Sequence, residues 1–256
     1  MLPSDTSNNN VSEKQKKPIL RMLDPYERFI LGGLLLVIMC GWAFISLSAD
    51  VMQGQTQSLD ERILLALRTE GDPTDPIGSE AWEDIGRDIT ALGGYAFLIL
   101  LMVGVSGYLF LARKRQMGWF LNAAVVSGFV MTMTLKSVFQ RPRPDVVTHI
   151  SHVSTSSFPS GHSMMSMIVF LTMGALLARI STRRRLKIYC MTIAVVLSLL
   201  VGCSRVYVGV HYPTDVLAGW SAGVVWATLA CLIASWLERK GFIGLHEHVK
   251  NGSREG

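Results

Sequence analysis

Charged side chains and cysteines are scarce in this chain of 256 residues. Asp, Glu, Lys and Arg make up 17% of it, whereas roughly a quarter is usual in soluble domains, and half of the residues are hydrophobic. With a mean hydropathy of +0.36, this balance excludes an ordinary soluble domain and indicates a membrane protein. The four cysteines contain no Cys-x-x-Cys pair and lie in apolar stretches, which favours buried thiols over disulfides or zinc. They are Cys40, Cys190, Cys203 and Cys231.

Six apolar segments fit spans of a bilayer. The first, residues 29–47, is long enough at 1.5 Å per residue for a hydrocarbon core of roughly 30 Å, and it is too long and too late in the chain for a signal peptide. The others are residues 94–112, 118–135, 163–180, 188–203 and 216–237. The sequence therefore predicts an all-α fold, a bundle of six transmembrane helices, with both termini on one side.

Between the first two spans, residues 48–92 carry ten acidic side chains against three Arg. Two apolar stripes with helical spacing occur there, one formed by Leu59, Ile63, Leu64 and Leu67, the other, after a cap at Ser79, by Trp82, Ile85 and Ile89. Short amphipathic helices at the membrane interface and a soluble pair of helices in an outer loop both fit this pattern.

Basic residues predict the orientation. Seventeen of the 24 Lys and Arg residues lie in the two tails, residues 1–28 and 238–256, or in the loops that share their side. By the positive-inside rule that side is cytoplasmic. The basic pI of about 9.1 then reflects loops facing anionic lipid head groups, so no nucleic-acid partner is expected.

Three polar clusters interrupt the apolar sequence between residues 136 and 215, and all fall in loops on the opposite, extracytoplasmic side. They run from Lys136 to Pro144, from Phe158 to His162 and from Ser204 to Asp215. In the third, His211 and Asp215 are four residues apart, and Pro213 at the start of a helix would let the carboxylate reach one ring nitrogen. The other nitrogen would then stay basic, as a nucleophile requires.

The first two clusters suit an anion. Arg143, between Pro142 and Pro144, offers a fork of donors to phosphate oxygens, whereas Arg141 is expected to be a solvated loop arginine. Lys136 ends a span, where it either snorkels to the interface or reaches a polar site. The Ser160-Gly161 turn precedes a helix, which gives an ordinary Ser cap or free N–H groups for an anion.

The same residues and spacing resemble the signature of the type 2 phosphatidic acid phosphatase (PAP2) superfamily, K-x6-R-P, P-S-G-H and S-R-x5-H-x3-D. The resemblance implies that His211 attacks phosphorus to give a phosphohistidine, that Asp215 orients it and that His162 protonates the leaving group. It also implies which groups hold the phosphoryl oxygens, namely Lys136, Arg143, Ser160, Gly161 and Arg205. We expect no cofactor and no metal, since His149 and His152 lack a nearby carboxylate or cysteine cluster and His246 and His248 lie in the tail.

The resulting expectation is a bacterial inner-membrane phosphatase whose partners are the bilayer and a phosphorylated lipid. Undecaprenyl diphosphate is narrowly favoured, followed by phosphatidylglycerophosphate, with phosphatidate and lipid A phosphates also open. A lipid phosphotransferase with the same intermediate, a vanadium haloperoxidase and a non-catalytic protein that binds or moves a phosphorylated lipid are the alternatives.

Overall fold

The computed structural model describes residues 24–147 and 156–241. His149, His152, His246 and His248 lie outside the described residues, as do most of the two predicted tails, 1–28 and 238–256.

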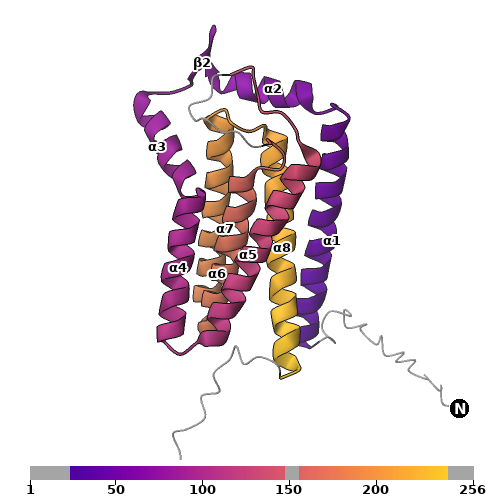
Figure 1. Ribbon diagram of the computed structural model, residues 1–256, viewed down its shortest axis with the longest axis vertical. Helices are drawn as coiled ribbons and strands as arrows, with labels where there is room; N and C mark the ends of the chain where they lie inside the picture. Colours follow the sequence, from indigo (N-terminus) through magenta and orange to yellow (C-terminus); the bar gives the residue numbers. More distant parts are fainter. Residues whose placement is uncertain (1–23, 148–155, 242–256) are drawn as a thin grey trace, which may run out of the picture.

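Six long helices form a bundle whose members run up and down between two ends (Figure 1). They are α1 (Pro25–Met52), α4 (Tyr95–Leu111), α5 (Arg115–Phe139), α6 (Gly161–Ile180), α7 (Arg184–Tyr207) and α8 (Pro213–Arg239). The shorter helices α2 (Gln57–Ala66) and α3 (Glu80–Ala91) lie at the upper end of Figure 1, joined by a hairpin of β1 (Arg68–Thr69) and β2 (Asp72–Pro76). The hairpin corrects the all-α expectation, although the fold is otherwise helical.

Five of the helices are long and apolar enough to cross a membrane by themselves. The remaining long helix, α4, has 17 residues and reaches that standard only when counted with α3, from which it is bent by 49°. The described chain therefore has five spans, or six if the bent pair is one span, and the number six stays a prediction. The amphipathic stripe of Trp82 and Ile85 lies on α3, directly before this bend.

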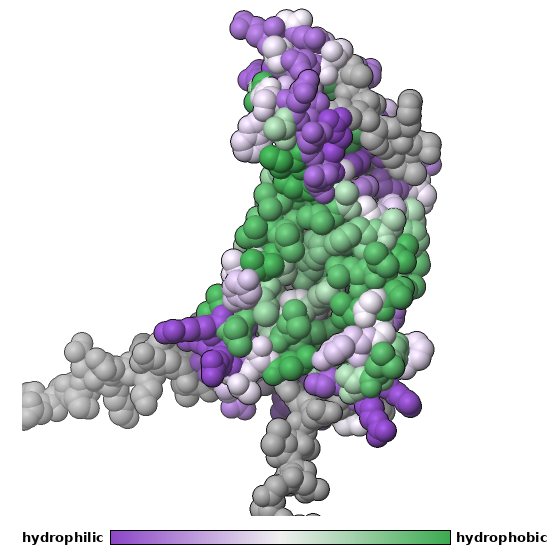
Figure 2. All heavy atoms as spheres, turned by 90° about the vertical axis from the view of Figure 1, so that its left-hand side faces the viewer, coloured by the Kyte–Doolittle hydropathy of each residue, from purple (hydrophilic) through white to green (hydrophobic). Residues whose placement is uncertain are grey.

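The bundle presents an apolar surface between two polar ends. Figure 2 shows a broad hydrophobic band around the middle, with hydrophilic side chains gathered above and below it. Large apolar side chains of the long helices are exposed, among them Leu100 of α4, which is 72% exposed, and Met39 of α1, which is 66% exposed. In water such a surface would be costly, and in hydrocarbon it is the expected lipid-facing surface.

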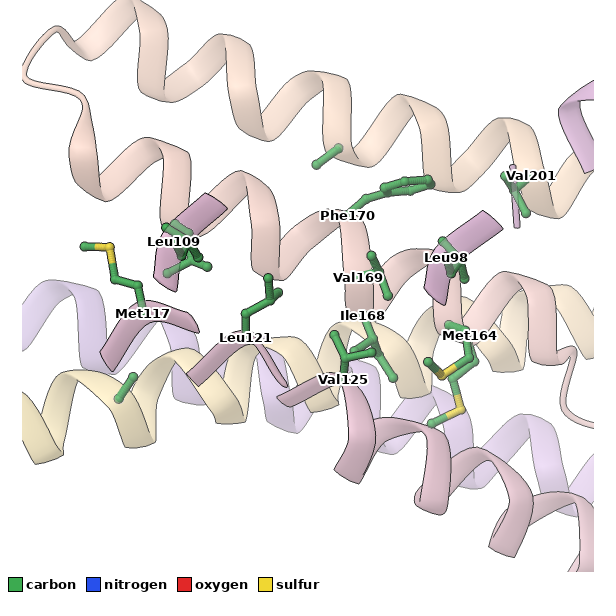
Figure 3. Packing of buried hydrophobic residues seen from close by; sticks show 14 residues of the cluster. Leu98, Leu109, Met117, Leu121, Val125, Met164, Ile168, Val169, Phe170 and Val201 are labelled. Atoms are coloured by element: carbon green, nitrogen blue, oxygen red, sulfur yellow. The ribbon is translucent and has the colours of Figure 1, made fainter. Parts of the chain in front are cut away.

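Helix α6 is the centre of the bundle. It packs against α5, α7 and α8. Of the residues in its apolar stretch, 61% are buried, the highest share among the five helices that could span a membrane by themselves. Ile168 and Val169 of α6 lie between Leu121 and Val125 of α5 and Val201 of α7 in a continuous core (Figure 3). This packing fixes the position of the N-terminus of α6, where Ser160 and His162 lie.

Gly219 marks the closest approach of α8 to the start of α6. A Cβ atom there would lie 2.7 Å from the carbonyl oxygen of Ser160 and 3.0 Å from the Cβ of Ser163. Gly219→Ala is therefore expected to destabilise the protein by about 1–3 kcal/mol, because rigid backbone must move. Gly104→Ala on α4 is the matched control, since nothing lies within 4 Å of its Cβ position. Thermal unfolding in detergent checks the pair, and equal melting temperatures for the two variants would contradict the prediction.

Candidate active site

The residues singled out in the sequence come together at the end of the bundle that α2 covers (Figure 1). Lys136 lies in the last turn of α5, Arg205 in the last turn of α7 and Asp215 in the first turn of α8. Ser160 is the N-cap of α6, whose first turn carries His162, and His211 lies in the connection between α7 and α8. Five of these side chains are nearly inaccessible to solvent: Lys136, Ser160, Arg205, His211 and Asp215.

His211 and Asp215 form the pair that their spacing predicts. The Nδ1 atom of His211 is 3.4 Å from Oδ2 of Asp215. Helix α8 begins at Pro213, and the same Oδ2 also accepts the backbone N–H of Tyr212 at 2.9 Å, so Asp215 closes a capping box at the helix start. The cap fixes the carboxylate, and the carboxylate in turn fixes the ring.

Ser157 completes this pair and was not singled out in the sequence. Its hydroxyl donates a short hydrogen bond to Oδ2 of Asp215 and lies 3.3 Å from Nδ1 of His211. Its backbone N–H donates to the carbonyl oxygen of Arg141 at 2.8 Å. Because Nδ1 faces the carboxylate, the network assigns the proton to Nδ1 and leaves the lone pair on Nε2.

The Nε2 atom of His211 faces cations. Nη1 of Arg143 lies 3.3 Å from it. Burial lowers the pKa of His211 well below the ordinary histidine value, and the positive charges of Arg205, Arg143 and Lys136 lower it further. The ring is therefore neutral at neutral pH, which a nucleophile requires.

Arg143, Lys136 and Arg205 differ in how they are held. Arg143 donates to the carbonyl oxygen of Val210 at 2.7 Å, and Lys136 donates to that of Ser156. Lys136 is 7% exposed, so it does not snorkel into bulk water. Arg205 is 3% exposed, and its Nε has no hydrogen-bond partner among the described residues. A buried guanidinium group with an unpaired N–H is costly, and an anion is the group that would satisfy it.

Ser160 caps helix α6, and Gly161 is a point of close packing in the site. The Oγ of Ser160 accepts from the Ser163 hydroxyl at 2.9 Å and from its backbone N–H at 3.4 Å, while the Ser160 N–H donates to the carbonyl of Asp215 at 2.9 Å. A Cβ atom on Gly161 would lie 2.6 Å from the Tyr95 hydroxyl and 3.1 Å from Cε of Lys136. A Cβ atom here would therefore displace the ends of two side chains of the site, Tyr95 and Lys136.

Tyr95, at the start of α4, is a second neighbour that the motifs do not contain. Its ring centroid lies 6.0 Å from that of His162, and its hydroxyl lies within electrostatic range of Arg205 and Arg143. His162 is half-buried and in turn lies within electrostatic range of Arg205, His211, Lys136 and Arg143. Both histidines therefore border the same group of cations.

The expectation of a solvated Arg141 is wrong. This side chain is 8% exposed and donates to Oδ1 of Asp215 at 2.7 Å and to Oδ2 of Asp60 at 2.9 Å. Burial opposes its charge, but the carboxylates of Asp215 and Asp60 outweigh that effect and raise the pKa of Arg141. Asp60, on α2, is 0% exposed and was seen in the sequence only as one of ten acidic residues in its segment.

Among the residues that the structure describes, no three His, Cys, Asp or Glu side chains are grouped as ligands of a metal ion. His149 and His152 are outside that set. Independence from metal stays a prediction.

Comparison with known proteins identifies the family. The sequence model of the PAP2 superfamily matches residues 116–239. Phosphatidylglycerophosphatase B of Bacillus subtilis (strain 168) is 33% identical over 186 residues, which cover 71% of this chain and 86% of that protein. The chain belongs to the PAP2 superfamily.

Other PAP2 relatives are named after other lipid phosphates. Lipid A 1-phosphatase of Rhizobium etli is 28% identical over 185 residues, covering 62% of this chain and 75% of that protein. Undecaprenyl-diphosphatase BcrC of Bacillus subtilis is 32% identical over 139 residues, covering 53% and 65%. The crystal structure of a transmembrane PAP2 type phosphatidylglycerolphosphate phosphatase from Bacillus subtilis matches with a TM-score of 0.72 and 31% identity, over 79% of this chain and 98% of that one. The PAP2 chain described here is thus a multi-span bacterial membrane protein.

Proposed function

We propose that this PAP2 protein hydrolyses a phosphate or diphosphate ester of a membrane lipid through a phosphohistidine formed on His211. Membership of the PAP2 phosphatases makes the chain a hydrolase. The observation that carries the mechanism is the orientation of His211, with Nδ1 toward Asp215 and Nε2 toward Arg143 inside a group of buried cations. A non-catalytic lipid-phosphate site would need the cations but not a histidine held in this way.

In the first step, Nε2 of His211 attacks phosphorus while the bond to the leaving oxygen breaks. Positive charge develops on the imidazole, and the Asp215 carboxylate, 3.4 Å from Nδ1, stabilises it. Arg143, Arg205 and Lys136 stabilise the phosphoryl oxygens, with the Gly161 N–H near the start of α6 as a further donor. His162 donates a proton to the leaving oxygen, which departs as the lipid alcohol or the lipid monophosphate.

In the second step, water attacks the phosphohistidine and His162 takes up a proton from it. Inorganic phosphate leaves and His211 returns to its neutral form. The cations supply charge stabilisation that a metal ion provides in other phosphoryl-transfer sites, so we propose that no metal takes part.

Several lipid phosphates are candidate substrates. The sequence narrowly favoured undecaprenyl diphosphate as the substrate. The matches to phosphatidylglycerophosphatase B and to the crystal structure cover most of both chains, so we now consider phosphatidylglycerophosphate an equally good candidate.

We further propose that the site faces the cell exterior. The connections that carry Arg113–Arg115 and Arg183 lie at the end of the bundle opposite His211, as the positive-inside rule requires for a cytoplasmic face (Figure 1).

Phosphate release by the detergent-purified protein, measured with a chelator present, tests the proposal. The panel contains phosphatidylglycerophosphate, undecaprenyl diphosphate, phosphatidate and lipid A phosphate. Turnover of at least one lipid is expected, and addition of Mg²⁺ is expected to leave the rate unchanged. Quantitative transfer of labelled phosphate to a lipid acceptor would replace hydrolysis by phosphotransfer, and binding of all four lipids without any reaction would overturn catalysis.

A further inference from the structure

A buried row of three charges connects α2 to the nucleophile. Arg141 lies between two carboxylates, with one guanidinium nitrogen 2.7 Å from Asp215 and the other 2.9 Å from Asp60. Asp60 and Asp215 are 0% exposed, and Arg141 stacks over the ring of Tyr212 with its central carbon 4.1 Å from the ring centroid. Asp60 touches none of the groups that face the phosphoryl position, and the mechanism above does not use it.

Asp60 also holds the beginning of α8. Its Oδ1 accepts the backbone N–H of Thr214 at 3.0 Å, and its Oδ2 accepts the Thr214 hydroxyl. Thr214 is the second residue of α8, so this carboxylate from another helix satisfies an N–H that the helix leaves unpaired and lies at its positive end. The next residue along α8 is Asp215.

We infer that Asp60 is a positioning residue for phosphoryl transfer, acting through Arg141 and the first turn of α8 on the His211–Asp215 pair. The inference rests on the proposed function, because it takes His211 as the nucleophile. The carboxylate of Asp60, on the short helix α2, would set the charge and the orientation of the His211–Asp215 pair.

The physical reason is the distribution of charge. Arg141 alone beside Asp215 would neutralise that carboxylate, and little negative charge would remain to stabilise the imidazolium of His211. With Asp60 on its other side, Arg141 divides its attraction between two carboxylates, and the three groups together keep one net negative charge. The planar guanidinium fork fits this bridging role, because its two terminal nitrogens can reach separate acceptors, whereas a lysine ammonium is a single point charge.

The test compares variants of the full-length protein in detergent. Asp60→Asn removes the charge with little change of shape, Asp60→Glu restores it, and Arg141→Lys keeps the cation but loses the fork. Asp84→Asn on α3 is the matched control, since this exposed carboxylate pairs only with Arg87 among the described residues. The measured quantities are kcat and KM with a lipid that the wild type hydrolyses, and the affinity for orthovanadate, a phosphoryl-transfer analogue that needs no lipid.

Asp60→Asn is expected to lower kcat about tenfold to thirtyfold, as small displacements of reacting groups do, with KM within about twofold of the wild type. Vanadate affinity falls by a similar factor, Asp60→Glu recovers most of the loss, and Arg141→Lys resembles Asp60→Asn. The double variant Asp60→Asn with Arg141→Lys loses no more than about twofold beyond the worse single variant, because both act through one connection.

Three results would overturn the inference: a kcat of Asp60→Asn within twofold of the Asp84→Asn control, losses that multiply in the double variant, or a lowered melting temperature with unchanged kcat and vanadate affinity. If Asp60→Asn does not fold, Arg141→Lys is compared with Asp84→Asn instead. A kcat of Arg141→Lys within twofold of that control, or a lowered melting temperature with unchanged kcat and vanadate affinity, then overturns the inference. Failure of the proposed function looks different, because the wild type would then turn over no lipid. Vanadate binding that is equal in wild type and Asp60→Asn would reject the inference alone.

Discussion

His211→Ala is expected to lower the rate of lipid phosphate hydrolysis by about four orders of magnitude or more, as removal of a covalent nucleophile does elsewhere. The described site contains no second nucleophile oriented like His211, whose Nδ1 faces Asp215 and whose Nε2 faces Arg143. Phosphate release from the lipid and trapping of a labelled phosphoprotein after an alkaline quench measure the effect. The wild type is expected to give an acid-labile, alkali-stable adduct, and the variant none.

His162→Ala separates the two histidines. As general acid, His162 matters most when the leaving oxygen is a poor leaving group, such as a lipid alcohol. Its loss is therefore expected to slow phosphohistidine formation severely with lipid, but to leave a burst of p-nitrophenol from p-nitrophenyl phosphate, whose leaving group needs no proton. His211→Ala should be inactive with both substrates. A His211→Ala protein that still hydrolyses either substrate at a tenth of the wild-type rate would exclude the phosphohistidine.

Arg205→Met is expected to lose activity and gain stability together. Loss of one buried donor to a charged transition state costs about 10²–10³-fold in kcat. In the unliganded protein the same guanidinium is 3% exposed, has an Nε without a partner in the described chain and lies near the like charge of Arg143. Replacing it with an apolar side chain of similar length removes that cost, and a gain of roughly 1 kcal/mol would raise the melting temperature by about 2–4 °C.

Kinetics and thermal unfolding of Arg205→Met in the absence of phosphate measure both effects. Arg87→Met on α3 is the matched control, because Arg87 is half exposed and pairs with Asp84 and Glu83 at the surface. It is expected to change neither quantity beyond twofold in rate or 1 °C. An Arg205→Met protein that melts several degrees lower would mean that this side chain is structural, and one with full kcat would remove it from the phosphate site.

Local patterns predicted much of this molecule because their causes are local. The start of α8 at Pro213 and the four-residue step from His211 to Asp215 follow from helix geometry, and the cap at Ser160 follows from the preference of serine for that position. The spans follow from runs of apolar residues. In each case the residues that make the structure are close neighbours in the chain.

The parts that the sequence did not reveal depend on distant partners. Arg141 is buried because Asp60, 81 residues earlier, lies on one side of it and Asp215 on the other, and neither spacing has a periodicity that predicts contact. Ser157 contacts His211 across 54 residues. The hairpin after Arg68 is too short to show an alternating pattern, and α4 is a short helix that reaches the length of a span only through its bent neighbour α3.

Helix α1 packs along α8, although the two helices are far apart in the chain. Asp60 lies on α2, the next helix after α1, and it accepts hydrogen bonds from Arg141 and from Thr214 at the start of α8. A nascent chain therefore cannot form these contacts until α8 has entered the membrane and packed against α1. The His211–Asp215 pair and the carboxylate of Asp60 therefore come together only when segments far apart in the chain have docked on one another within the membrane.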